Sequence, residues 1–151
     1  MIGRLAVQIV ILWLLTVSSG CSNSGPVADI VDTVSVSGTL TYQGKALPGY
    51  QVSFQPVSGE RPATAISDAD GKFVLGTNDT GDGAAPGTHK ISVVWVAPSD
   101  DGMGEVIDDP SKLPKAPTEI PAKYHAVETS GLQMDIPPGG TQDLRVELNQ
   151  P

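Results

Sequence analysis

Hydrophobic and polar residues alternate along several short stretches of this chain, beginning at residue 34. Successive side chains of a β-strand point to opposite faces, so this alternation predicts strands with one buried face. The stretch 89–96 becomes apolar on both faces toward its end, which indicates a central strand. We expect seven strands, at residues 34–42, 50–55, 63–67, 72–75, 89–96, 132–136 and 143–148.

Turn signals separate these stretches. Gln43-Gly44-Lys45 and Asp68-Ala69-Asp70-Gly71 are residue combinations that favour tight turns. The chain contains 13 prolines and 17 glycines, and no helical periodicity is found after residue 21. Helix interiors tolerate neither residue well, so the pattern predicts an all-β domain, a seven-stranded β-sandwich over residues 34–149.

A long proline-rich acidic loop, residues 97–123, interrupts the alternation. It contains five prolines, six acidic residues and three basic residues. Unstructured connections longer than about 12–15 residues are uncommon in compact domains. Two interpretations stay open: an insertion that the fold tolerates, or a contact surface for a partner. The candidate contacts are Asp100, Asp101, Asp108 and Asp109 in the loop and Tyr124 directly after it.

The first 21 residues have the pattern of an export signal. Arg4 supplies a positive start, and the apolar run 5–17 is shorter than the ~20 residues that cross a bilayer as a helix. Small residues then precede Cys21, the single cysteine of the chain. This arrangement resembles a bacterial lipobox, with Ser18 where leucine is usual. The resemblance implies a signal peptide at residues 1–20, a diacylglyceryl thioether on Cys21, and a membrane partner held through that lipid.

The lipobox resemblance also implies a cell-envelope location. Residues 21–33 then comprise the lipidated cysteine and a tether that keeps the domain close to its membrane. Ser22 follows the cysteine, where aspartate is typical of retention in the inner membrane. We therefore expect the outer membrane in preference to the inner one.

The charge of the chain limits the classes of partner that it can bind. The net charge is −8, and removal of residues 1–20 with their one charged side chain leaves eight basic and seventeen acidic residues, a net charge of −9. A domain this acidic lacks the basic surface of nucleic-acid-binding proteins, so we expect no nucleic-acid partner. Anionic lipid head groups also repel it, so charge does not hold it at a membrane.

Four segments resemble carboxypeptidase regulatory-like domains, which have a transthyretin-like (prealbumin-like) fold. The segments are 36–56 with the turn from Gly44 to Gly49, 67–75 with Asp68, Gly71 and Phe73, 86–93 with His89 where tyrosine is usual, and 120–136. The resemblance covers residues 34–149 and implies a Greek-key sandwich. It also implies an accessory, non-catalytic role, because such domains pack against enzymes, extend surface proteins or bind partners.

Catalytic and metal-binding patterns are missing from the sequence. His89 and His125 are far apart and no G-x-S-x-G motif is present, so we expect both histidines to be structural or surface residues. A calcium loop starting at Asp68 would need glycine where Phe73 stands, and zinc would need three or four clustered ligands. We expect no cofactor and no metal, and we expect turn-forming roles for Asp68, Asp70, Asp79 and Asp82.

The aromatic residues bear on sugar binding, which uses exposed rings. Trp95 alternates with Ile91 and Val93, so we expect it in the core. Tyr124 is then the best candidate for an exposed ring, with a packing residue as the alternative.

Taken together, the sequence favours an envelope lipoprotein that acts as a non-catalytic binding or scaffolding module, and not an enzyme. Its partner would be an envelope protein or glycan. One alternative is a carbohydrate-binding module for cell-wall or extracellular glycan, which exposed aromatic rings in one concave patch would favour. Others are a structural coat protein, which self-association would favour, and a hydrolase or metal-dependent enzyme, which needs convergent polar groups with perturbed pKa values.

Overall fold

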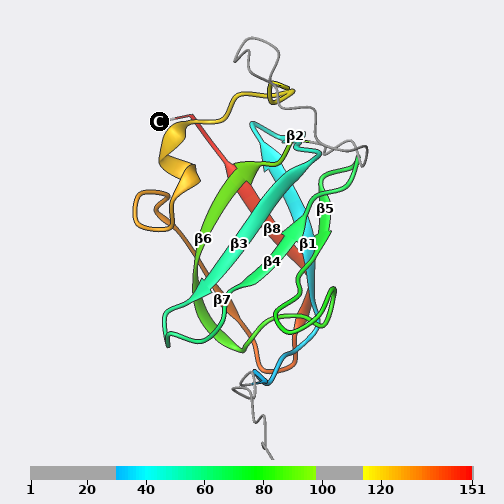
Figure 1. Ribbon diagram of the computed structural model, residues 1–151, viewed down its shortest axis with the longest axis vertical. Helices are drawn as coiled ribbons and strands as arrows, with labels where there is room; N and C mark the ends of the chain where they lie inside the picture. Colours follow the sequence, from blue (N-terminus) through cyan, green and yellow to red (C-terminus); the bar gives the residue numbers. More distant parts are fainter. Residues whose placement is uncertain (1–29, 98–113, 151) are drawn as a thin grey trace, which may run out of the picture.

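The computed structural model describes residues 30–97 and 114–150, which form two four-stranded β-sheets packed against each other (Figure 1). The predicted signal peptide, Cys21 and the loop aspartates Asp100, Asp101, Asp108 and Asp109 lie outside these residues. The strands are β1 (Val36–Tyr42), β2 (Lys45–Ala46), β3 (Tyr50–Pro56), β4 (Ala63–Ile66), β5 (Lys72–Val74), β6 (Gly87–Trp95), β7 (Leu132–Ile136) and β8 (Thr141–Leu148). The prediction of an all-β, two-sheet architecture is confirmed for the described part of the chain.

The first sheet is built around β1. β8 pairs with it in parallel along nearly its whole length, with Leu40 opposite Val146. On its other side, β1 pairs antiparallel with β5 and β2. A Cβ atom at Gly38 would lie 2.8 Å from Phe73 Cζ and 2.9 Å from Leu144 Cβ. The close approach of these strands therefore requires glycine at this position.

The second sheet is antiparallel, in the order β4-β3-β6-β7. Its two long central strands, β3 and β6, pair with Val52 opposite Val93. Alternate residues of both sheets point inward and form a single core, as the period-two pattern predicts. Its fully buried members include Val36, Leu40, Leu47, Tyr50, Val52, Phe54, Leu75, Ile91, Val93, Ile136, Val146 and Leu148.

Two short elements differ from the prediction. Gln43 and Gly44 have φ angles of 52° and 75°, so these two residues alone make a tight hairpin turn, and Lys45 already belongs to β2. The described chain thus has eight strands where seven were predicted. A 3-10 helix, η2 (Ala122–His125), also begins inside the segment that was predicted to lack regular structure.

The two ends of the sandwich carry different parts of the chain (Figure 1). The first described residues lie at the lower end in Figure 1, which we call the tether pole. The end of β6 and the end of β8 lie at the upper end, which we call the distal pole. The segment from residue 114 to η2 also lies at the distal pole.

The chain is fastened to the domain at the tether pole by one side chain, Asn78. Its amide nitrogen donates a hydrogen bond of 2.8 Å to the Val31 carbonyl, and its Oδ1 accepts one of 3.0 Å from the Val31 N–H. Val34 and Ala84 then exchange two backbone hydrogen bonds, of 2.9 and 3.0 Å. Residues 31–34, at the end of the predicted tether, are therefore held against the domain.

A candidate binding pocket at the distal pole

Three aromatic side chains from three strands meet at the distal pole. Tyr42 ends β1, Tyr50 begins β3 and Trp95 ends β6. Tyr50 and Trp95 are directly opposite each other in the β3–β6 ladder, so their side chains lie on the same face of the sheet. Tyr42 shares the inward parity of Leu40. The three rings therefore line the end of the space between the two sheets.

These rings line a pocket with a volume of about 690 Å³. Small-molecule sites in proteins typically span roughly 300–1,000 Å³, so the pocket is large enough to hold a ligand. The rest of its described lining comes from Val94, Ala116, residues 118–122, His125 and Gln150.

Tyr50 connects the core to this segment. The side chain is buried, and its hydroxyl donates a hydrogen bond to the Thr118 carbonyl. Burial raises the pKa of Tyr50 above its ordinary value of 10.0. The hydroxyl therefore stays protonated throughout the neutral range and keeps the segment next to the aromatic wall.

Tyr124 holds the same segment from the other end. Its ring is only 4% exposed, and its hydroxyl donates a hydrogen bond of 2.8 Å to the Asn149 carbonyl and accepts one of 3.1 Å from the Asn149 N–H. Of the two predicted placements for this ring, exposed or packed, the structure shows the packed one, because η2 turns the ring into the core. Tyr124 positions the pocket lining and does not present its ring to a partner.

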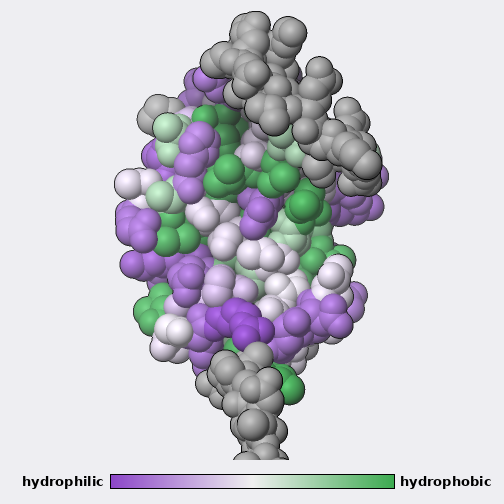
Figure 2. Space-filling view, viewed as in Figure 1, coloured by the Kyte–Doolittle hydropathy of each residue, from purple (hydrophilic) through white to green (hydrophobic). Residues whose placement is uncertain are grey.

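Trp95 also differs from the expectation. It packs against the core but is only partly buried, because it lies at the end of β6 where the pocket opens. Its neighbour Val94 points to the outer face of the sheet and is 43% exposed. Figure 2 shows hydrophobic surface gathered over the upper half of this face, on the side of the distal pole.

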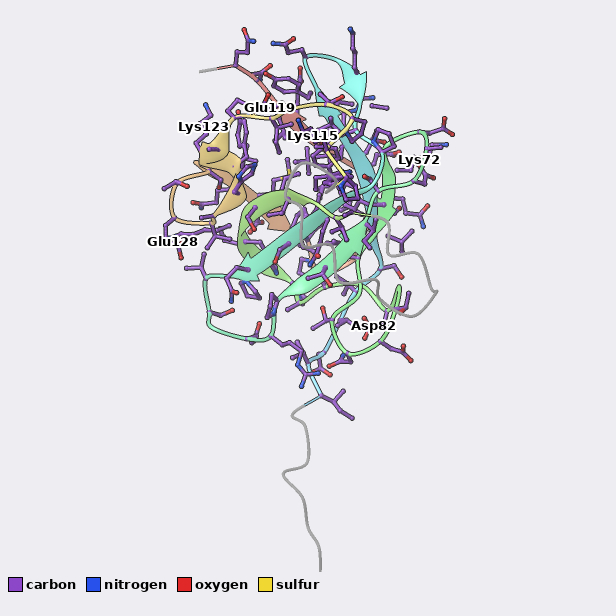
Figure 3. The ribbon with its side chains drawn as sticks, turned by 45° about the horizontal axis from the view of Figure 1, so that its top comes forward. Lys72, Asp82, Lys115, Glu119, Lys123 and Glu128 are labelled. Atoms are coloured by element: carbon purple, nitrogen blue, oxygen red, sulfur yellow. The ribbon has the colours of Figure 1, made fainter. Side chains whose placement is uncertain are left out.

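The rim of the pocket is polar. Glu119, His125 and Gln150 line it and are exposed to solvent. Figure 3 shows Glu119 at the distal pole, far from Asp82. The prediction that His125 is a surface residue is confirmed. A carboxylate, an imidazole and an amide together offer hydrogen-bond acceptors and donors, so this rim suits a neutral polar ligand.

Asp68 and Asp82 accept hydrogen bonds within their own loops, which agrees with the predicted turn-forming roles. Asp68 Oδ1 accepts hydrogen bonds of 2.9 Å from the Asp70 N–H and 2.8 Å from the Lys72 N–H. Within residues 30–97 and 114–150, no group of three or more histidine, cysteine, aspartate or glutamate side chains could hold a metal ion.

Asp82 stabilises the loop that carries Asn78. Partial burial acts to raise its pKa, but hydrogen bonds from the Thr77 N–H (2.7 Å), the Asn78 N–H (3.1 Å) and the Asn78 amide (3.0 Å) outweigh burial. The pKa of Asp82 is therefore below its ordinary value of 3.8. This carboxylate belongs to the tether pole and takes no part in the pocket.

His89 is a core residue, which confirms the prediction of a structural role. Its side chain is fully buried, and its Nδ1 donates to the Gly87 carbonyl at 2.9 Å. Its ring centroid lies 6.1 Å from that of Phe54. Its Nε2 has no hydrogen-bond partner among the residues that the structure describes.

A second hollow lies between the edge strands β4 and β5 and has a volume of about 860 Å³. Its most exposed apolar side chains are Ile66 and Val74, at 60% and 57%. The carboxylate that lines it from Asp68 is already engaged in the turn described above. Its one aromatic lining residue is the buried Phe73, whereas the distal pocket is lined by three aromatic residues and is therefore the better candidate site.

The alternating pattern alone predicts neither Tyr42 nor Tyr50 as a site residue. The usable signal was their position: each is the terminal residue of an alternating stretch and has inward parity. Such residues line the ends of a sandwich, where the space between the sheets opens.

Among the described residues, no helix is both long enough and apolar enough to cross a membrane. Comparisons of the chain with protein-family models, with curated proteins and with solved structures find no match.

Proposed function

We propose that this protein is an envelope lipoprotein whose β-sandwich is a non-catalytic binding module, with the distal pocket as its binding site. The observation that carries the proposal is that the N-terminal chain and the pocket lie at opposite ends of the domain. The chain that leads back to Cys21 leaves at the tether pole, and the aromatic pocket lies at the opposite pole (Figure 1). A lipid on Cys21 would therefore direct the pocket away from the membrane, toward partners in the envelope.

The short distance along the chain from Cys21 to the domain supports this orientation. Nine residues separate Cys21 from Val31, where Asn78 fastens the chain. A chain of this length reaches at most roughly 35 Å when fully extended, so a lipid on Cys21 would keep the tether pole near the membrane. The outer membrane, suggested by Ser22, is the proposed location.

For the fold, we propose a carboxypeptidase regulatory-like, transthyretin-like Greek key. The two-sheet architecture is consistent with it, and so are the residues of the motif at 67–75. Gly71 has a φ of 75° in the turn, where the conformation favours glycine, and Phe73 is buried in the core. Domains of this kind mostly serve as accessory binding or scaffolding modules, which agrees with the proposed role.

Site-specific photocrosslinking in cells tests the proposal. A benzophenone amino acid is placed at Gln150, on the rim of the pocket, and in a control at Ser58, in the β3–β4 connection at the tether pole. We expect a defined protein or glycan adduct from position 150 only, and loss of membrane fractionation in Cys21→Ala. Equal adducts from both positions, or none from either, would overturn the proposed site. Adducts only with copies of the chain would indicate a structural coat protein instead.

A further inference from the structure

The distal pocket combines an aromatic wall with a polar rim. The partly exposed rings of Tyr42 and Trp95 line one hollow, and the buried ring of Tyr50 lies behind them. An aromatic face carries a partial negative charge, so it attracts the weakly positive C–H groups of a ligand as well as excluding water from them. A sugar ring has such a C–H face, bordered by hydroxyl groups.

The rim matches the hydroxyl groups of a sugar. A hydroxyl both donates and accepts hydrogen bonds, so it needs partners of both kinds. The Glu119 carboxylate accepts, the Gln150 amide donates and accepts, and the His125 imidazole offers one ring nitrogen of each kind when neutral. All three side chains are exposed, so a ligand can reach them.

Charge further limits the class of ligand that the pocket can bind. The chain has a net charge of −8, and the rim itself contains the carboxylate of Glu119. The ammonium group of the nearby Lys123 lies 4.8 Å from the centroid of the Tyr124 ring, where it is engaged in a cation–π contact. Among the described lining residues of the pocket, Glu119 is the one acidic side chain and no lysine or arginine is present, so the lining favours a neutral ligand over an anionic one.

We infer that the distal pocket binds a neutral sugar unit of a glycan, with its C–H face on the aromatic wall and its hydroxyls on Glu119, His125 and Gln150. This inference rests on the proposed function, since it names the ligand class of the same pocket. It makes the protein a lipid-anchored carbohydrate-binding module that faces outward from its membrane.

The chain carries its own reporter for this test. Removal of the signal peptide takes Trp13 away, so Trp95, in the pocket wall, is the one tryptophan of the mature lipoprotein. The mature lipoprotein is titrated, in a detergent that contains no sugar, with four probes: maltohexaose, cellohexaose, chitohexaose and xylohexaose. We expect at least one of them to cause a saturable change in Trp95 fluorescence.

A matched pair of variants then assigns the site. Glu119→Gln changes a carboxylate on the rim, and Glu128→Gln changes an exposed carboxylate outside the described pocket lining (Figure 3). Loss of a hydrogen bond to a charged group weakens binding, so the dissociation constant rises about tenfold. We expect that change in Glu119→Gln and an unchanged constant in Glu128→Gln.

The outcomes separate the two levels of the proposal. Absence of a fluorescence change with all four probes, or equal weakening by both variants, would overturn the sugar site. If Gln150 still gives a specific protein adduct in cells while all four sugars fail, the binding module stands and only its ligand class is wrong. If both experiments fail, both proposals fall.

Discussion

Asn78 shows how much one side chain can do at the boundary between a tether and a domain. Its amide takes the place of a neighbouring backbone, since it gives one hydrogen bond to Val31 and accepts one from it. It also donates to Asp82, which in turn holds the loop in place. This arrangement determines where the N-terminal chain leaves the domain.

Asn78→Ala should release residues 31–33 and lower the free energy of unfolding by about 1–2 kcal/mol, because three partly buried hydrogen bonds are lost. Urea unfolding gives the stability, and hydrogen exchange at the Val31 amide reports the release. Asn149→Ala is the matched control, because only the backbone of Asn149 makes the hydrogen bonds described here. Equal protection of Val31 in both variants would show that Asn78 does not hold the chain.

Asp82 should make the stability of the tether pole depend on acidic pH. Its folded-state pKa lies below the ordinary 3.8, so its contribution is present above that value and is lost as the pH falls below it. We expect the free energy of unfolding to decline on acidification below about pH 4, and less steeply in Asp82→Asn than in the parent. Asp70→Asn, at an exposed turn residue, should leave the slope unchanged. Identical slopes in all three proteins would contradict the assignment.

At the scale of elements, the parallel β1–β8 pair joins the first and last strands of the described chain. Leu40 lies opposite Val146 in this ladder, and both are fully buried. The pairing brings β8 so close to β1 that Gly38 has room for no side chain. The contact is therefore a place where packing, and not turn chemistry, selects glycine.

Gly38→Ala should destabilise the domain by about 2–3 kcal/mol, because its Cβ would meet Phe73 and the Leu144 backbone and side chain in a packed core. Gly139→Ala is the comparison: nothing lies within 4 Å of a Cβ there, so we expect a change within about 0.5 kcal/mol. Thermal and urea unfolding measure both. Similar stabilities for the two variants would mean that the strands separate easily to accommodate a methyl group.

The sequence predicts the long elements better than the short ones, for physical reasons. Period-two alternation is strong in β1, β3 and β6, since each buries one face along seven or more residues. β2 has only two residues and both are exposed, so no pattern reveals it. Helix η2 is a single turn, and its one buried residue, Tyr124, lies in a segment without periodicity.

The pocket and the chain fastening escape prediction for a different reason, which is sequence distance. Alternation assigns Trp95 to the inner face of its strand, but it does not say that the strand end opens into a pocket. The partner of Asn78, Val31, lies 47 residues away, and no local pattern connects them. The sequence therefore predicts which side chains face the core of the sandwich. The location of the site depends on which strand ends the fold brings together, and the sequence does not show this.

On the scale of the whole molecule, the fastening at Val31 and the aromatic pocket lie at opposite poles of one sandwich. If a lipid on Cys21 holds the tether pole near a bilayer, then the β3–β4 connection, which contains Ser58, lies on the near side, and the end of β6, at Trp95, lies on the far side. Energy transfer from tryptophan to dansyl-labelled lipid in vesicles measures this directly. In the mature lipoprotein, from which Trp13 has been removed with the signal peptide, we expect weaker transfer from Trp95 than from a tryptophan introduced by Ser58→Trp in the Trp95→Phe variant. Because both donors are on the same domain, equal or reversed efficiencies would mean that the domain lies on its side or is inverted. The pocket would then face the membrane, and a partner within the bilayer surface would replace an outward-facing one.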